Sequence, residues 1–315
     1  MLKHLILLLT LGLASAASRA TEPLKQAPPA PAVQTMKPRI KLALWGDSRE
    51  NLDQACEQIA SVLLNDITDW DVQVHSGDFT HKGGEEDWQR SLHYKGIDKL
   101  FVKGRFLMTT SNHDCSEKDN PGVRAIYDKY TKNVLPVNSL DHTTHFYAWD
   151  KGNVHIVFCD GFFTDPVTMK TWLDSYLKTV PRGDWLIGVW HDPAYEITYK
   201  ESYLDTCRPW LDAVFNHGGK FIMNGHAHVY LRTKPLRPDG TVDAKNGMVH
   251  IINGTGGASW KEPVVPDQKI AFTPSVRSFP CITFLTFEGD TATLQTVDAR
   301  PGSKLKVIDE FRWTK

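Results

Sequence analysis

The stretch Asn224-Gly225-His226-Ala227-His228-Val229-Tyr230 decides the interpretation of this chain, because it joins a predicted buried strand to two closely spaced histidines. The strand is the apolar run at residues 220–223, directly before it. Gly225 lets the backbone turn where that strand ends. Two imidazoles two residues apart can then reach one metal ion or two neighbouring ions. Paired histidines also occur in ordinary loops, so the rest of the chain has to decide between the two interpretations.

Four segments upstream also place a polar, metal-compatible side chain just after a short apolar run. The runs, with the residue that follows each, are 40–44 with Asp47, 71–74 with Asp78, 105–108 with Asn112, and 185–188 with His191. Open α/β folds gather their ligands at the carboxyl ends of their strands. The sequence therefore predicts an α/β fold with its chemistry at that edge of the sheet.

Taken in order, the five segments resemble the motifs of the calcineurin-like metallophosphoesterases. These motifs are an Asp motif, a GD motif, GN-H-D/E, a lone His after a strand, and GHxH. Here they appear as Gly46-Asp47, Gly77-Asp78, Asn112-His113-Asp114, His191 and Gly225-His226-Ala227-His228. One such motif is a weak signal, but five in the same order are specific. The resemblance covers about residues 39–260.

Three further features are similar to the purple-acid-phosphatase-like branch of that superfamily. They are Tyr230-Leu231-Arg232, His191-Asp192-Pro193-Ala194-Tyr195, and a hairpin at residues 146–160 followed by a helix. The resemblance implies an α/β fold of the αββα type, a sandwich of two sheets with the metal site at the C-terminal strand edge. It also implies hydrolysis of a phosphate ester by metal-bound hydroxide.

The resemblance implies two metal ions held by residues of these motifs. Asp78 corresponds to the carboxylate that bridges both ions and offsets both charges. Asp47 and His228 correspond to ligands of the first metal, and Asn112, His191 and His226 to ligands of the second. Oxygen and imidazole donors suit iron, manganese or zinc without choosing between them.

His113 and Asp114 correspond to residues that act beside the metals. A histidine there can donate to the phosphate and protonate the leaving oxygen, and Asp114 is expected to orient its other nitrogen. A purely structural role for His113 stays open at this point.

Two positions depart from the family's pattern. The wider family has D-x-H in its first motif, and here Arg49 takes the place of that histidine; a protonated guanidinium has no lone pair for a metal. Arg49 is expected to bind a phosphate oxygen, with an ion pair to Glu50 or Asp53 as the alternative. His81 stands where the purple branch has a metal-binding tyrosine. It either completes the first metal site or is a solvent-facing loop histidine.

The N-terminus predicts export. Lys3 and His4 precede an apolar run at residues 5–13 and the small residues Ala14-Ser15-Ala16, as in a secretory signal peptide. We expect a signal peptide at 1–20, a Pro-rich linker at 21–38 and a metallophosphoesterase domain at 39–315. The apolar run is too short for a stable membrane anchor, so we expect a periplasmic or secreted protein.

Composition limits the kinds of partner that this chain is expected to bind. The formal net charge is −1 and no long basic run occurs, so nucleic acid is not an evident partner. The expected substrate is a small-molecule phosphate ester. Five scattered cysteines without a CxxC pair argue against a zinc knuckle, and an odd number leaves at least one thiol free.

Periodicity predicts the helices and the C-terminal strands. One apolar stripe has Leu52, Cys56, Ile59 and Leu63 at helical spacing, and another has Met169, Trp172, Leu173, Tyr176 and Leu177 after Asp165-Pro166. A third helix is predicted around residues 210–215, ending at Gly218-Gly219. Strands are predicted at 248–253, 282–287, 291–297 and 305–311, with a hairpin turn at residues 288–290.

The function expected from these observations is that of an exported binuclear-metal phosphohydrolase acting on monoesters. Two alternatives stay open on the sequence. One is a phosphodiesterase or nucleotidase of the same fold. The other is a binding protein on a degenerate phosphoesterase fold, which the missing D-x-H histidine would fit.

Overall fold

The structure is a computed structural model that describes residues 38–116, 121–139, 141–195, 202–261, 267–274 and 278–315. The predicted signal peptide and all but the last residue of the predicted linker lie outside these residues. All described residues belong to one compact unit, Met36–Lys315.

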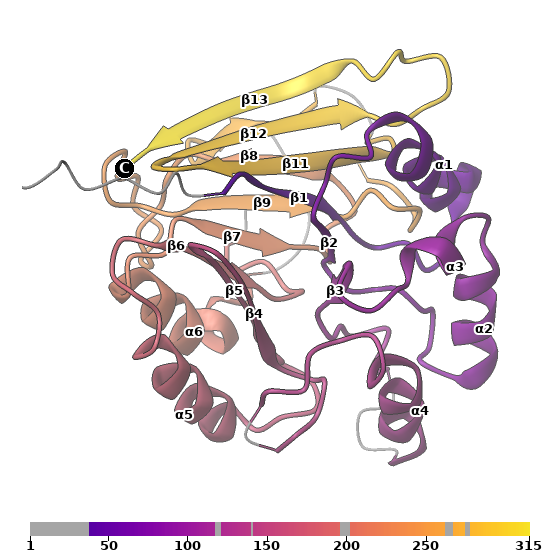
Figure 1. The fold of residues 1–315 in the computed structure, drawn as a ribbon, viewed down its shortest axis with the longest axis horizontal. Helices are drawn as coiled ribbons and strands as arrows, with labels where there is room; N and C mark the ends of the chain where they lie inside the picture. The colour runs from indigo at the N-terminus through magenta and orange to yellow at the C-terminus, as the bar shows by residue number, and fades with distance from the viewer. Residues whose placement is uncertain (1–37, 117–120, 140, 196–201, 262–266, 275–277) are drawn as a thin grey trace, which may run out of the picture. The chain divides into compact units, whose positions relative to one another are not determined.

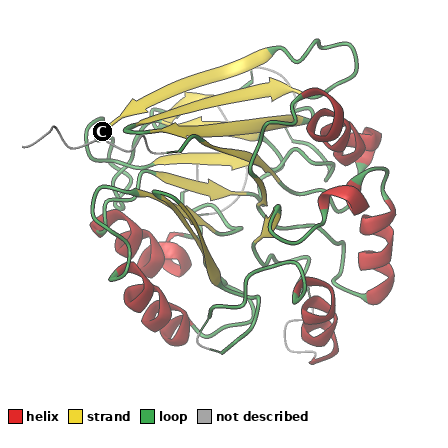
Figure 2. Ribbon diagram, viewed as in Figure 1, coloured by secondary structure: helices red, strands yellow, loops and turns green. Residues whose placement is uncertain are grey.

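The first of two mixed sheets has six strands in the order β13-β12-β11-β1-β2-β3. Their bounds are β1 (Ile40–Trp45), β2 (Val72–His75), β3 (Phe106–Met108), β11 (Cys281–Glu288), β12 (Thr291–Asp298) and β13 (Val307–Thr314). β1, β2 and β3 are parallel, whereas β11 pairs antiparallel with β1 and continues into an antiparallel hairpin. Figures 1 and 2 show β11 to β13 extending the sheet beyond β1.

The second sheet has seven strands in the order β10-β8-β9-β7-β6-β5-β4. Their bounds are β4 (Tyr147–Lys151), β5 (Val154–Phe158), β6 (Trp185–Val189), β7 (Phe221–Asn224), β8 (Tyr230–Thr233), β9 (Val249–Asn253) and β10 (Ile270–Phe272). Its centre is parallel, because β5, β6, β7 and β9 run in one direction.

The second sheet is apolar on both faces, and this makes it an inner layer of a sandwich. Along β6, Trp185, Ile187 and Val189 join the core cluster that also contains the strands of the first sheet. Leu186, which points to the opposite face, joins a separate cluster with residues of two helices. Continuous apolar runs of this kind are typical of parallel strands covered on both sides.

Helices cover the outer faces. Their bounds are α1 (Ala55–Ser61), α2 (Glu85–His93), α3 (Ile97–Leu100), α4 (Pro121–Thr131), α5 (Pro166–Leu177) and α6 (Leu204–Asn216). α5 and α6 pack on the second sheet, and α1 and α2 contribute Cys56, Ile59 and Trp88 to the core on the side of the first sheet (Figure 1). α5 begins as predicted, with Asp165 accepting from the backbone N–H groups of Val167 and Thr168. None of the helices in the described residues has both the length and the apolar character needed to cross a membrane.

The predicted αββα sandwich is confirmed. Each predicted strand is present with bounds that differ by at most three residues, and the turn at Gly289 joins β11 to β12 with a positive φ of 57°. The predicted apolar stripe is confirmed at Cys56 and Ile59 in α1 and at Leu63 in the helical turn Val62–Asp66 that follows, but Leu52 is 38% exposed, because α1 begins three residues later. All five cysteines are buried and free.

Hydrogen bonds within each sheet and between the two sheets bring the ligand-bearing strand ends to one place. Gly225, after β7, donates from its backbone N to the carbonyl oxygen of His191, after β6, at 3.0 Å. Asp47, after β1, donates in the same way to Gly77, after β2, at 2.9 Å. The two edges meet where the backbone N of His226 donates to the Asp47 carboxylate at 3.0 and 3.1 Å.

Candidate metal centre

Asp47, Asp78 and His228 form the first of two clusters in which potential ligand atoms lie within 4.8 Å of one another. All three side chains are buried. His228 donates from Nδ1 to the carbonyl oxygen of Ser259 at 2.7 Å, so its Nε2 lone pair faces the cluster, 3.6 Å from Oδ1 of Asp47. The three residues come from the ends of β1, β2 and β7.

His191, Asp192 and His226 form the second cluster. The amide oxygen of Asn112 lies between its two histidines, 3.1 Å from Nε2 of His191 and 3.1 Å from Nδ1 of His226. His191 donates from Nδ1 to the carbonyl oxygen of Ser76 at 2.7 Å, and this fixes the orientation of its ring.

Asp78 connects the two clusters. Its Oδ1 lies 3.2 Å from Nε2 of His191 in the second cluster, whereas the Asp78 carboxylate is also part of the first. One carboxylate thus presents oxygen atoms to two neighbouring sets of ligands. That is the arrangement that a bridging ligand requires.

Three of these residues have a left-handed backbone, with φ values of 57° at Asp47, 58° at Asp78 and 65° at His226. This conformation is uncommon for residues other than glycine and costs of the order of 1–3 kcal/mol each when it is strained. The neighbouring glycines allow close approach: a Cβ on Gly225 would lie 2.4 Å from Oδ2 of Asp47, and one on Gly77 would lie 2.7 Å from Nδ1 of His191. Tight turns therefore direct these side chains into one small volume.

Ionisable groups are crowded among these ligands. Burial raises the pKa of Asp47 well above its ordinary value, and the neighbouring Asp78 adds to the rise. Burial alone would raise the pKa of Asp78 as well, but His191, His113 and Arg49 together hold it well below its usual range. Burial opposes protonation of His191, yet Asp78 and Asp47 raise its pKa to about 10. The buried carboxylates therefore favour positive charge beside them.

The donor set fits metal ions of the expected kind. Ligands bonded to one ion at about 2.0–2.1 Å lie about 3 Å apart, close to the separations among Asn112, His191 and His226. His191 and His226 each direct one ring nitrogen toward the Asn112 oxygen. Carboxylate, amide and imidazole donors suit iron, manganese or zinc. Asp47, Asp78, Asn112, His191, His226 and His228 are brought together, as the sequence predicts.

His113 lies beside this centre, but its partner is not the one expected. Its Nδ1 is 2.7 Å from the carbonyl oxygen of His81, and its backbone N donates to Oδ1 of Asp78 at 3.4 Å. Asp114 instead accepts from Thr80 and Ser111 at 2.7 to 2.8 Å and is fully buried. The expectation that Asp114 orients His113 is therefore corrected: Asp114 holds the loop that carries Asp78, because its two oxygens are used there.

Arg49 extends into the first cluster. Its Nε donates to Oδ2 of Asp78 at 3.0 Å, its Nη1 pairs with Glu50 at 2.5 Å, and its Nη2 lies 3.4 Å from Nε2 of His228. The side chain is only 8% exposed. Of the two ion-pair partners that the sequence suggests, Glu50 pairs with Arg49, whereas Asp53 forms no ion pair with it among the described residues.

His81 does not join either cluster among the described residues. Its side chain is 38% exposed, and its Nδ1 is 4.0 Å from Glu50. The ring stacks on His113 with a centroid distance of 5.6 Å and also lines a surface cavity of about 570 Å³ next to α2. This position favours the alternative, a loop histidine that faces solvent, and a role of His81 at the first metal site stays a prediction.

Two residues of the centre are absent from the sequence prediction. Asp192 lies 3.4 Å from Nδ1 of His226, and the hydroxyl of Tyr203 lies 3.1 Å from Nε2 of the same ring. Asp192 directly follows His191, so its position after β6 was a usable signal. Tyr203 precedes α6, and no local pattern indicates that it reaches the end of β7.

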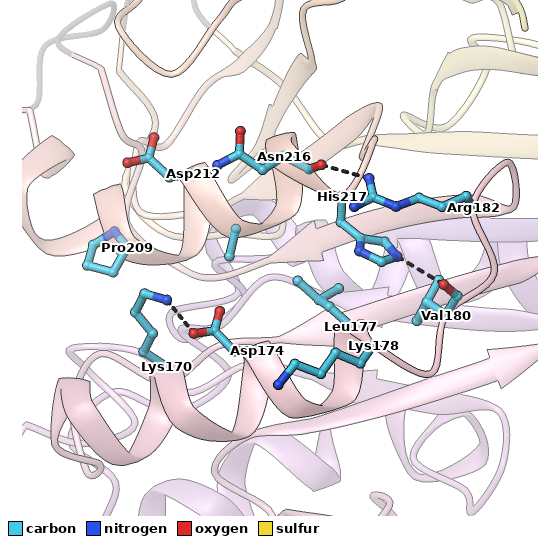
Figure 3. A pocket seen from close by; sticks show the side chains of 11 residues that line it. Lys170, Asp174, Leu177, Lys178, Val180, Arg182, Pro209, Asp212, Asn216 and His217 are labelled. Carbon is cyan, nitrogen blue, oxygen red and sulfur yellow. Dashed lines mark hydrogen bonds and ion pairs between the residues drawn. The ribbon is translucent and has the colours of Figure 1, made fainter.

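A surface cavity of about 880 Å³ between α5 and α6 is not part of this centre (Figure 3). There Lys170 pairs with Asp174, and Nε2 of His217 lies 2.9 Å from the carbonyl oxygen of Val180. None of the candidate ligands lines it. We place the chemistry at the two clusters, because buried convergent ligands rather than open volume indicate a metal site.

The sequence of this chain matches a known protein family. Residues 45–230 match the calcineurin-like phosphoesterase family. An acid phosphatase of Aspergillus ficuum is 32% identical over 101 residues, which make up 27% of this chain and 16% of that protein. The matched segment is thus a small part of that relative.

Solved structures share the fold. A purple acid phosphatase, PPD1, from yellow lupin (Lupinus luteus) seeds has a TM-score of 0.70 and 18% identity, covering 88% of this chain and 54% of the lupin chain. GAP50, described as the anchor in the inner membrane complex of Plasmodium, has a TM-score of 0.65 and 14% identity, covering 88% and 89%. PhoD has a TM-score of 0.64 and 11% identity, covering 88% and 70%.

Proposed function

Because the chain belongs to the calcineurin-like phosphoesterase family and has the fold of a purple acid phosphatase, we propose that it is an exported phosphohydrolase that cleaves phosphate monoesters with two metal ions. The metals would be iron, manganese or zinc. The chain spans only 54% of the lupin phosphatase, so its substrate has to be argued from its own site.

The observation that carries the proposal is the position of Asp78. Its carboxylate faces two clusters of buried ligands at once, with one oxygen 3.2 Å from His191. Asp78 also accepts from Arg49 and from the backbone N–H of His113, so the support for a metal role is its place between the two sets of ligands rather than any lack of partners. A carboxylate between two ligand sets, on a left-handed backbone, supports a bridge between two cations.

The chain's own residues would hold the metals and keep them in place. His191 and His228 are oriented by the carbonyl oxygens of Ser76 and Ser259, so that each presents Nε2. Tyr203 lies against Nε2 of His226 and would keep the Nδ1 of that ring directed at the second metal. When bound, metals of this kind polarise the phosphate and lower the pKa of a coordinated water to near neutral.

His113 would supply the proton for the leaving oxygen. Donation from Nδ1 to the His81 carbonyl would leave Nε2 as the nitrogen available to substrate. Arg49, which also pairs with Glu50 beside the centre, would add positive charge for the phosphate dianion. No serine or cysteine nucleophile is required.

Export is supported by the sequence of the first twenty residues alone. An apolar run bounded by Lys3 and by the small residues Ala14-Ser15-Ala16 is typical of a cleaved signal peptide. N-terminal sequencing of the protein recovered from the periplasm or medium tests this. A mature N-terminus near residue 21 supports export, and recovery of the intact chain from the cytosol alone contradicts it.

The substrate is tested with matched monoester and diester pairs, such as p-nitrophenyl phosphate and bis-p-nitrophenyl phosphate, on protein loaded with each candidate metal. We expect kcat/KM to favour the monoester. A preference for the diester would assign the chain to the phosphodiesterase alternative.

Absence of hydrolysis with every metal would favour a non-catalytic role. GAP50, which shares the fold, is described as an anchor. Measuring the bound metal in the same preparations separates an inactive enzyme from a binding protein, because a binding protein need not hold two ions.

A further inference from the structure

We propose that Arg49 is an internal cation that competes with the first metal ion, so that this metal binds only when the guanidinium leaves Asp78 and His228. This inference rests on the proposed metal-dependent function and adds that Arg49 limits how tightly the first metal ion binds. It follows from where the guanidinium lies.

Arg49 contacts two of the three residues of the first cluster. Its Nε donates to Oδ2 of Asp78 at 3.0 Å, and its Nη2 approaches Nε2 of His228 at 3.4 Å. Asp47 completes that cluster. The guanidinium therefore faces the same ligand atoms that a metal would need.

These contacts and metal coordination exclude each other. Nδ1 of His228 donates to the Ser259 carbonyl, so the remaining lone pair on Nε2 is the one that can accept from Arg49. A lone pair that accepts this hydrogen bond is not available to a metal. A cation in the cluster would also face a permanently protonated guanidinium across a buried, poorly screened distance.

Neighbouring carboxylates hold the Arg49 guanidinium in this position. Asp78 is 1% exposed and lies beside the fully buried Asp47, and a buried carboxylate is stabilised by a paired cation such as the Arg49 guanidinium. Glu50, 28% exposed, pairs with Nη1 of Arg49 toward the surface. Glu50 can keep the guanidinium after a metal displaces it from Asp78.

The test is calorimetric titration of the metal-stripped full chain with Mn²⁺ or Zn²⁺, comparing wild type with Arg49→Ala and Arg49→His. We expect both variants to bind the first-site ion at least about tenfold more tightly than wild type, with the other binding event unchanged. Arg49→His should be the tighter of the two, because an imidazole adds a ligand. Introducing Asp47→Ala into Arg49→Ala should remove the gained affinity, and this identifies the site.

Arg300→Ala is the matched control. Arg300 pairs with Asp298 at 2.7 Å, remote in sequence from every candidate ligand, and its loss should leave both binding events unchanged. Thermal unfolding gives a second readout. Metal should raise the melting temperature of Arg49→Ala more than that of wild type, because stabilisation grows with affinity.

Three results decide the matter. Tighter first-site binding in the Arg49 variants but not in Arg300→Ala supports competition. Unchanged or weaker binding in folded Arg49 variants, with phosphatase activity retained by wild type, overturns the inference and leaves the proposed function standing. No metal binding by any form, wild type included, refutes the proposed function and the inference together.

Discussion

At the scale of single residues, backbone strain and ligand position coincide. Asp47, Asp78 and His226 have left-handed backbones, and each contributes a candidate ligand atom. Such conformations persist where surrounding contacts fix them, as the hydrogen bonds from the His226 backbone to Asp47 do here. The turns after the strands therefore place the ligand side chains at a cost in local backbone stability.

His113→Ala should keep the metals and lose turnover, most severely for alkyl phosphates, whose leaving groups need a proton. Its ring contacts a backbone carbonyl and lies outside both clusters, so its removal leaves the candidate ligands intact. Rates on aryl and alkyl phosphates, with metal content measured beside them, test this. An equal loss on both substrates would point to phosphate binding instead of acid catalysis.

His81→Ala should leave the metal content unchanged. The ring is 38% exposed and does not join either cluster, although the equivalent position binds metal in the family that the chain resembles. Elemental analysis of the purified variant decides this. Loss of one ion per chain would show that His81 moves into the first site when the metal binds.

At the scale of elements, one buried ion pair ties the two sheets together. Asp309 in β13 accepts from Nε and Nη2 of Arg232 in β8 at 2.7 and 2.8 Å, and from the hydroxyl of Tyr230 at 2.8 Å. Asp309→Ala leaves a buried guanidinium without its partner, and this should lower the free energy of unfolding by about 3 kcal/mol or more. Urea unfolding measures it.

Lys170→Ala is the control for that experiment, because its exposed pair with Asp174 should contribute little. If Asp309→Ala and Lys170→Ala lower the free energy of unfolding by the same amount, the ion pair between the sheets is not a major source of stability.

The β4–β5 hairpin should be stabilised by a protonated histidine. Burial opposes the charge on His155, but Asp150, at 2.6 Å, and Asp184, at 3.3 Å, raise its pKa above the ordinary value. When folding raises the pKa of a histidine, the protonated ring stabilises the folded state. This stabilisation is complete below the ordinary pKa of about 6.5 and is lost as the pH rises through the raised pKa. His155→Gln should therefore cost more unfolding free energy at pH 5.5 than at pH 9. Equal losses at both values would exclude a charged role for His155.

For the whole molecule, the sequence predicted the strands and the ligands at their ends because both signals are local. A buried parallel strand is a continuous apolar run, and β1, β6 and β7 each precede a candidate ligand. α2 was missed because it is mostly polar and buries only Trp88 and Ser91, so it contains too few apolar residues to form a visible stripe. The contact of Tyr203 with His226 and the insertion of Arg49 between Asp78 and His228 depend on how distant elements meet. No spacing in the sequence encodes them.

The central claim is that catalysis requires metal held around Asp78. The most direct test is the rate of p-nitrophenyl phosphate hydrolysis by metal-stripped wild type and Asp78→Asn as Mn²⁺, Zn²⁺ or iron is added back, with bound metal counted. Asp174→Asn in α5 is the control. The account predicts that wild-type and control rates recover with metal, while Asp78→Asn binds less metal and stays about a thousandfold slower or more, because the bridge has lost its charge. Hydrolysis by stripped wild type at the reloaded rate, or near-normal turnover in Asp78→Asn, would contradict it.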